Sequence, residues 1–104
     1  MMEHAIEYLK NINKAFESRA RLGIMSVLMV EEEVDFSFLK ETLDLTDGNL
    51  SSHLRALEGA SYLNVEKQFI GRRPNTRYSA TAKGKNDFKS HLDALEKLIR
   101  DNKP

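Results

Sequence analysis

Residues 45–58 read LTDGNLSSHLRALE, a pattern typical of a capped helix with one narrow apolar stripe. Thr46 is a favourable N-cap residue, and Asp47 lies in the first turn, where the helix dipole favours a negative charge. The stripe consists of leucines at the i, i+4 and i+7 positions, namely Leu50, Leu54 and Leu57. The other sides of the helix carry short polar side chains and one arginine. A helix that needed only solubility would more often carry Glu and Lys there.

Short side chains suit a helix whose backbone must come close to another surface, and the major groove of duplex DNA is such a surface. We therefore expect this helix to read DNA; a solvated helix with few charges is the alternative. The residues predicted to contact DNA from this helix are Gly48, Asn49, Ser51, Ser52 and Arg55.

The segment after the helix is typical of a β-hairpin. Residues 62–69 alternate and are rich in aromatic and β-branched side chains, residues 70–75 form a turn cluster, and residues 76–80 form a return strand. Arginines in the loop and return strand, supported by Lys83, are expected to contact phosphates or the adjacent minor groove. These arginines are Arg72, Arg73 and Arg77. An exposed turn that only increases solubility is the alternative for the first two.

The rest of the chain is predicted to be a mostly helical scaffold. Helices are expected at 5–17, 19–32, 38–43 and 82–101, with Ser37 and Thr81 as caps of the last two, and a short third strand at 34–36. The predicted fold is α+β: a winged helix-turn-helix with a two-stranded β wing and terminal dimerisation helices, in a single domain over residues 1–104.

The terminal segments 4–17 and 82–101 each carry a longer apolar face than so small a domain can cover alone. A two-fold homodimer in which these helices pack together would bury both faces. It would also place two reading helices about 34 Å apart, which predicts a pseudo-palindromic operator. The alternative is that both helices fold back on their own core. The predicted dimer contacts are Leu9, Ile12, Phe16, Phe88, Leu92, Leu95 and Ile99.

Five ordered motifs, spread over residues 17–90, resemble the small winged-helix transcriptional regulators related to the MarR and ArsR groups. The motifs are RARLGIMSVL at 19–28, FSFLK at 36–40, LTDGNLSSHL at 45–54, GRRPNTRY at 71–78 and TAKG at 81–84. The resemblance implies a homodimeric, DNA-binding regulator of transcription, most often a repressor. The chain departs from the family at Ser61, where a glycine usually precedes the aromatic that starts the wing. A left-handed backbone there would cost a non-glycine residue about 1 kcal/mol. The alternative is that Gly59, two residues earlier, lets the helix end sooner.

Composition narrows these expectations. The 104 residues contain no cysteine, which excludes disulfides and metal sensing by thiolates. The start of the chain lacks a signal-peptide apolar region, and no apolar run approaches the ~20 residues that span a membrane, so a cytoplasmic protein is expected. The three histidines lack ligand spacing, so neither a metal nor another cofactor is expected. Enzyme motifs such as a P-loop or HExxH are missing as well, which predicts a protein that is not an enzyme.

A net charge of zero is the main objection to DNA binding. The charge is unevenly distributed, however: residues 1–61 hold 6 Lys or Arg and 11 Asp or Glu, whereas residues 62–104 hold 10 and 5. Because the local field governs docking onto phosphates, a basic wing is compatible with DNA binding. The alternative function is a winged-helix module that binds protein and makes little or no DNA contact. Its support is the zero net charge and Asp47 at the tip of the reading helix.

Overall fold

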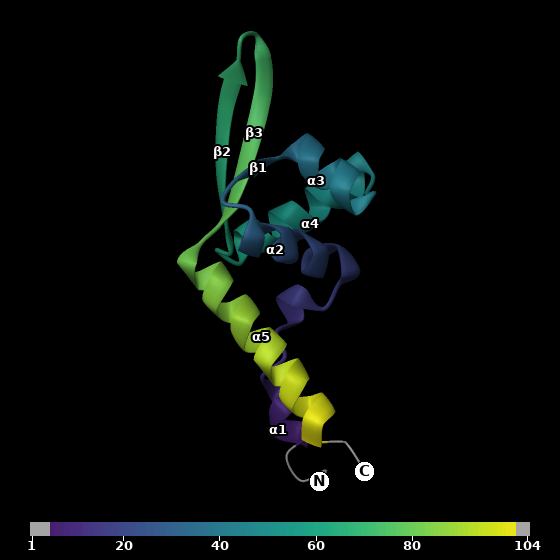
Figure 1. The fold of residues 1–104 in the computed structure, drawn as a ribbon. Coiled ribbons are helices and arrows are strands. Elements are labelled where there is room, and N and C mark those ends of the chain that lie inside the picture. Colours follow the sequence, from purple (N-terminus) through teal and green to yellow (C-terminus); the bar gives the residue numbers. More distant parts are fainter. Residues whose placement is uncertain (1–4, 102–104) are drawn as a thin grey trace.

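In the computed structural model, which describes residues 5–101, a helical body lies between a long β-hairpin and a pair of terminal helices (Figure 1). The molecule is elongated, with principal extents of 58 × 25 × 21 Å. The elements are α1 (Ala5–Lys10), the 3-10 turn η1 (Lys14–Phe16), α2 (Arg19–Val30), β1 (Val34–Asp35), α3 (Phe36–Leu43), α4 (Asp47–Gly59), β2 (Leu63–Ile70), β3 (Arg73–Ala80) and α5 (Ala82–Asp101).

Helices α3 and α4 form the predicted helix-turn-helix. The chain turns between them at Asp44, which is left-handed with φ of 52°. The Thr46 side chain accepts the backbone N–H of Asn49 at 3.2 Å, which confirms the predicted N-cap of α4. The predicted cap of α3 is wrong. Asp35 rather than Ser37 caps this helix, because its carboxylate accepts the backbone N–H of Phe38 at 2.8 Å, so α3 starts two residues earlier.

The three strands form one antiparallel sheet with the order β1-β3-β2. The wing turn is shorter than predicted: strand pairing continues to Ile70 and Arg73, which leaves only Gly71 and Arg72 in the turn. Gly71 has φ of +63°, as the first central position of a type II′ turn requires. Pro74 is tolerated within β3 because it needs no N–H there. It follows Arg73, which forms the hydrogen-bonded pair with Ile70 at the turn, so an N–H at Pro74 would point away from β2. On that side β1 pairs only with Arg77 and Tyr78, and the edge beside Pro74 is open.

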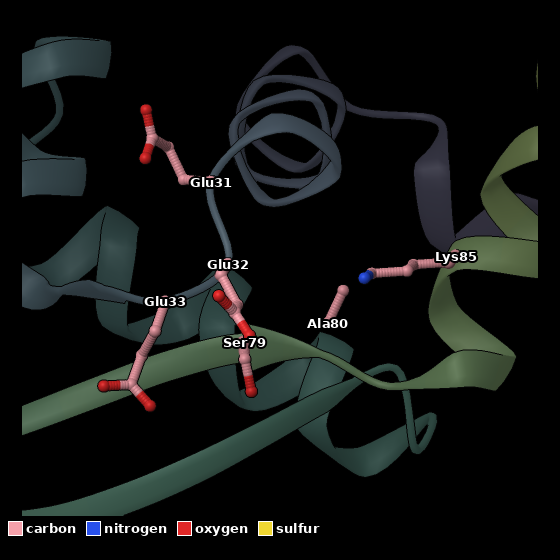
Figure 2. Close-up of a pocket in the computed structure, with 6 residues that line it drawn as sticks. All are labelled: Glu31, Glu32, Glu33, Ser79, Ala80 and Lys85. Carbon is pink, nitrogen blue, oxygen red and sulfur yellow. The ribbon is translucent and has the colours of Figure 1, made fainter.

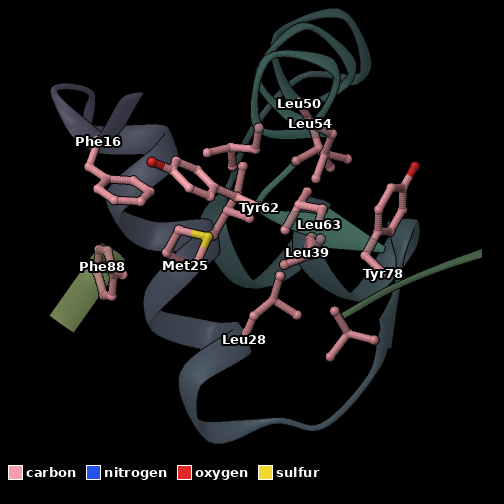
Figure 3. Packing of buried hydrophobic residues seen from close by; sticks show 13 residues of the cluster. Phe16, Met25, Leu28, Leu39, Leu50, Leu54, Tyr62, Leu63, Tyr78 and Phe88 are labelled. Atoms are coloured by element: carbon pink, nitrogen blue, oxygen red, sulfur yellow. The ribbon is translucent and has the colours of Figure 1, made fainter. Parts of the chain in front are cut away.

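The core lies where the helix-turn-helix, α2 and the root of the sheet meet (Figure 3). The predicted leucine stripe of α4 is confirmed as its inward face, since Leu50, Leu54 and Leu57 are at most 3 % exposed. Phe16 and Phe88 lie in the same core, with ring centroids 5.1 Å apart, and are 0 and 2 % exposed. Both were predicted dimer contacts, but their side chains are not accessible to a second chain.

The predicted helix over 5–17 is interrupted after Lys10. Asn13 explains the break, because it makes three contacts that an α-helix at this position would not allow. Its backbone N–H donates to His91 Nδ1 at 3.0 Å, its side-chain oxygen accepts the N–H of Ala15, and its amide nitrogen donates to the Tyr62 hydroxyl at 2.7 Å. The interruption separates α1 from the core, and α1 packs along α5 instead (Figure 1).

The junction between α4 and the wing is a Schellman motif. The N–H of Ser61 donates to Glu58 and that of Tyr62 to Leu57, with Ser61 in the left-handed region at φ of 66°. The position where the family usually has a glycine is therefore left-handed in this chain. Thr81 caps α5 as predicted, because its hydroxyl accepts the N–H of Gly84 at 2.8 Å, and the same hydroxyl donates to the Ser61 carbonyl.

Candidate nucleic-acid interface

The side of α4 that faces away from the core is open. Gly48, Asn49, Ser52 and Arg55 are exposed, and Ser51 is half-buried. A Cβ added at Gly48 would meet nothing within 4 Å, so the helix surface is open at this position. The structure thus brings all five predicted residues to one accessible helix, with short side chains beside a single arginine.

A groove separates α4 from the wing and adds a basic residue that the sequence prediction missed. Lys67 of β2 lines it together with Ser51, Arg55 and Glu58 of α4. Val65 and Tyr78 lie at the inner end of the same groove, and side chains alternate along a strand, so Lys67 must face α4. Counting in steps of two from Val65 would have identified it from the sequence.

A second groove flanks α4 on the side of α2 and the helix-turn-helix turn. Asn49 and His53 line it with Ser18 and Arg19. Arg21 Nε donates to His53 Nδ1 at 3.1 Å, and the Arg21 guanidinium also donates to the Ala15 carbonyl. Arg21 thus anchors α4 to α2, with His53 Nδ1 as the acceptor.

An ion pair reduces the negative charge at the start of α4. Lys40 Nζ of α3 lies 2.8 Å from the carboxylate of Asp47. Asp47 was the feature of α4 least compatible with phosphates. Its charge is therefore partly neutralised within the helix-turn-helix itself.

The basic residues predicted on and after the wing separate into two groups. Arg72 and Arg73 are exposed at the hairpin tip. Arg77 lies at the base, where its Nε donates to Glu33 and its side chain is only 27 % exposed. Lys83 donates to the Ala60 carbonyl at 3.4 Å and lies over the Tyr62 ring, 5.5 Å from its centroid. The last two side chains have partners within the chain, and only the tip arginines extend outward.

Polar contacts fix the wing relative to the helix-turn-helix. Asn75 donates to the Asp35 carboxylate at 3.3 Å, and Gln68 donates to Asn75 at 3.4 Å. Asp35 therefore caps α3 with one oxygen and holds β3 with the other. This carboxylate therefore links the wing to α3, the first helix of the helix-turn-helix.

An acidic depression lies at the root of the sheet (Figure 2). Glu31, Glu32 and Glu33 line it, together with Ser79, Ala80 and Lys85. Ser79 projects from the face of β3 opposite to the buried Tyr78. Arg77, which pairs with Glu33, projects from the same face as Ser79. The three glutamates would repel phosphates at this end of the sheet, away from the hairpin tip. Among the described residues, no cluster of His, Cys, Asp or Glu could hold a metal ion. Over residues 5–101, none of the helices has the length and apolar character needed to cross a bilayer.

The chain resembles known proteins over most of its length. Residues 20–99 match the family described as winged helix DNA-binding domain. An uncharacterized protein from Methanocaldococcus jannaschii is 37% identical over 87 residues, which are 84% of this chain and 95% of that protein. The solved structure of a transcriptional regulator homologue from Pyrococcus horikoshii OT3 is 38% identical, with a TM-score of 0.81 over 90% of this chain and 95% of that one.

The predicted resemblance to MarR proteins also has a structural counterpart. A Bacillus cereus protein assigned as a MarR-like transcription regulator superposes with a TM-score of 0.66, over 97% of this chain and 76% of that chain. At 22% identity, this likeness concerns the fold alone.

Proposed function

Because this chain belongs to the family of winged helix DNA-binding domains, we propose that it is a cytoplasmic, dimeric repressor of transcription that reads duplex DNA by sequence. Membership of a DNA-binding family agrees with the prediction that the chain is not an enzyme. The observation that carries the proposal is the accessible polar side of α4 beside a wing with an exposed basic tip. Similarity to a transcriptional regulator homologue of the same size supports it.

The interface divides into parts with different roles. The α4 side chains would contact base edges and nearby phosphates in the major groove, with Arg55 suited to a guanine. Lys67 in the groove beside α4 would bind phosphate, and Arg72 and Arg73 would reach the adjacent minor groove. Arg77 and Lys83 are left out of this interface because both have partners within the chain.

The terminal helices support a two-fold dimer. Helix α1 lies along the distal part of α5, which extends away from the body of the domain (Figure 1). Four large apolar side chains remain exposed on them: Ile6, Leu9, Leu92 and Ile99 are 67, 55, 43 and 66 % exposed. Burial against a second copy would remove this apolar surface from water and present two reading helices to a pseudo-palindromic operator. Ile12 and Leu95, both half-buried, would lie at the edge of the contact.

Fluorescence anisotropy tests the proposal. The protein would be titrated onto the duplex upstream of its own gene and onto a scrambled duplex, over about 50–200 mM salt. Preference for the native duplex, with affinity that falls steeply as salt rises, is expected. Arg55→Ala should lose about 1–3 kcal/mol and relax specificity at one position, whereas Arg72→Ala should weaken all sequences alike. No binding to either duplex at the lowest salt would contradict the proposal and favour a protein-interaction module.

A further inference from the structure

The tip of the wing carries an unusually exposed apolar pair. Phe69 is 71 % exposed and lies directly opposite Pro74 in the register of β2 and β3. Large aromatic side chains are seldom left in water on a slender hairpin, since their burial stabilises a protein by about 1.5–3 kcal/mol. Ile70, the next residue, is 61 % exposed and opposes Arg73. Phe69 and Ile70 therefore have similar exposed fractions, but their side chains project from opposite faces of the hairpin.

The Phe69 face of the hairpin is the one that adjoins α4. Val65 and Lys67 line the groove beside α4, and Phe69 is the next side chain in that alternating row. Pro74 continues the row from Tyr78 and Thr76 on the partner strand. Phe69 lies four positions after Val65 in the strand, which places it about 13 Å beyond the inner end of the groove. A duplex held by α4 would meet this row along one side and reach Phe69 beyond the major groove.

The charge around Phe69 and Pro74 favours a nucleic acid as the binding partner of the hairpin tip. Residues 67–76 hold three basic side chains, Lys67, Arg72 and Arg73, and no acidic one. Phosphates flank the minor groove on both sides, so an apolar tip close to cationic side chains matches that groove in both charge and polarity. Proteins that bind there often insert Phe or Pro between base steps.

We propose that Phe69, backed by Pro74, is an apolar wedge that enters the minor groove and partly unstacks one base step, while Arg72 and Arg73 hold the flanking phosphates. This inference rests on the proposed DNA-binding function. It adds a specificity element that makes no hydrogen bond to a base. A pyrimidine–purine step is unstacked most easily, so the operator is expected to carry such a step where the wing tip lies.

Paired alanine variants test the wedge. The probe is a duplex of about 30 base pairs, selected from a random pool by the wild-type protein, with 2-aminopurine at the flexible step. Phe69→Ala should lose affinity by about fivefold or more, and Ile70→Ala by less than about twofold. Neither should change the slope of affinity against salt, whereas Arg72→Ala should lower it by about 1. The 2-aminopurine signal should rise with wild type and Ile70→Ala, but not with Phe69→Ala.

The outcomes separate the wedge from the proposed function. Both variants remove exposed side chains, and thermal melting would establish that each is folded. If wild type binds the duplex and Phe69→Ala binds equally well, the wedge is wrong and the DNA-binding function stands. Equal losses of affinity for Phe69→Ala and Ile70→Ala would also overturn the wedge. Binding to vesicles of anionic lipid that depends on Phe69, without an effect on the duplex, would assign the tip to a membrane surface. Wild type that binds no duplex would overturn the function and the wedge together.

Discussion

Lys40 of α3 forms an ion pair with Asp47 at the first turn of α4, with Nζ and carboxylate oxygen 2.8 Å apart. The side chains are 44 and 72 % exposed, so the pair contributes less than about 1 kcal/mol to folding. Its importance lies in charge. Asp47 is at the end of the helix that we propose enters the major groove, and Lys40 offsets a carboxylate that would repel phosphates.

Asp47→Asn should therefore raise the affinity for all duplexes by several-fold, and Lys40→Met should lower it. The expected reason is repulsion between the carboxylate and nearby phosphates, which anisotropy titrations at about 50 mM salt would measure. Asp93→Asn, an equal change of charge on α5, is the control and should have little effect. If Asp47→Asn weakens binding instead, the carboxylate accepts a hydrogen bond from a base amine.

Ser61→Gly should stabilise the protein by about 1 kcal/mol, because Ser61 has φ of 66° and a glycine removes the left-handed cost. Urea unfolding would measure the change as a higher midpoint. Ser90→Gly is the matched control: Ser90 is an exposed residue within α5, where glycine should destabilise by about 0.5 kcal/mol. Equal changes at the two positions would contradict a local backbone strain at Ser61.

The features that could be predicted from the sequence are those determined by neighbouring residues. The Thr46 cap and the leucine stripe of α4 each depend on a few adjacent positions, and the structure has both. The sequence left the backbone conformation at Ser61 open, and the structure shows it to be left-handed. The open polar side of α4 follows from the same local periodicity. Its contact with DNA stays a prediction.

The errors arise where a residue's partner is distant in the chain. The first helix breaks because the Asn13 N–H donates to His91, 78 residues away. Asp35 caps α3 and also binds Asn75, 40 residues away, so the local preference of Ser37 as a cap did not decide the outcome. The partner of Arg77 within the chain was likewise not predicted, since Glu33 lies 44 residues earlier. A single sequence offers no local signal for such pairs.

Replacement by alanine should change the stability of the protein in opposite directions at two glycines. In Gly84→Ala, the new Cβ would lie 2.4 Å from the Tyr62 carbonyl oxygen, so α5 must shift and stability should fall by about 1–3 kcal/mol. Gly48→Ala meets no atom within 4 Å and should stabilise α4 by up to about 1 kcal/mol. Thermal melting measures both. The same Gly48→Ala should bind DNA less tightly if the backbone of α4 approaches the groove closely. Unchanged affinity would contradict that approach.

Stability should depend on pH through His91. Burial lowers the pKa of His91 below its ordinary value, and the charge of Glu17 opposes this only in part. The folded state therefore binds fewer protons than the unfolded one. The stability that comes from burying neutral His91 is fully present above the ordinary histidine pKa of about 6.5 and is lost as pH falls through the lowered pKa. Urea unfolding at pH 5 and pH 7.5 should show it for wild type. His91→Gln retains an acceptor for the Asn13 N–H and should lose much of the difference. An undiminished difference in His91→Gln would assign the effect to other groups.

Leu9→Lys should shift the proposed dimer toward monomer and raise its dissociation constant by at least about tenfold. The substitution places a charge in the apolar contact between α1, α5 and their symmetry mates, where it would lose its hydration. Sedimentation velocity over a range of concentrations measures the change. Val30→Lys is the matched control, since Val30 is 84 % exposed at the end of α2 and lies outside the terminal helices. Because each monomer would present one reading helix, Leu9→Lys should also bind a two-half-site duplex more weakly than Val30→Lys does. A wild-type protein that sediments as a monomer at every concentration, or equal shifts for both variants, would rule out the terminal helices as the dimer contact.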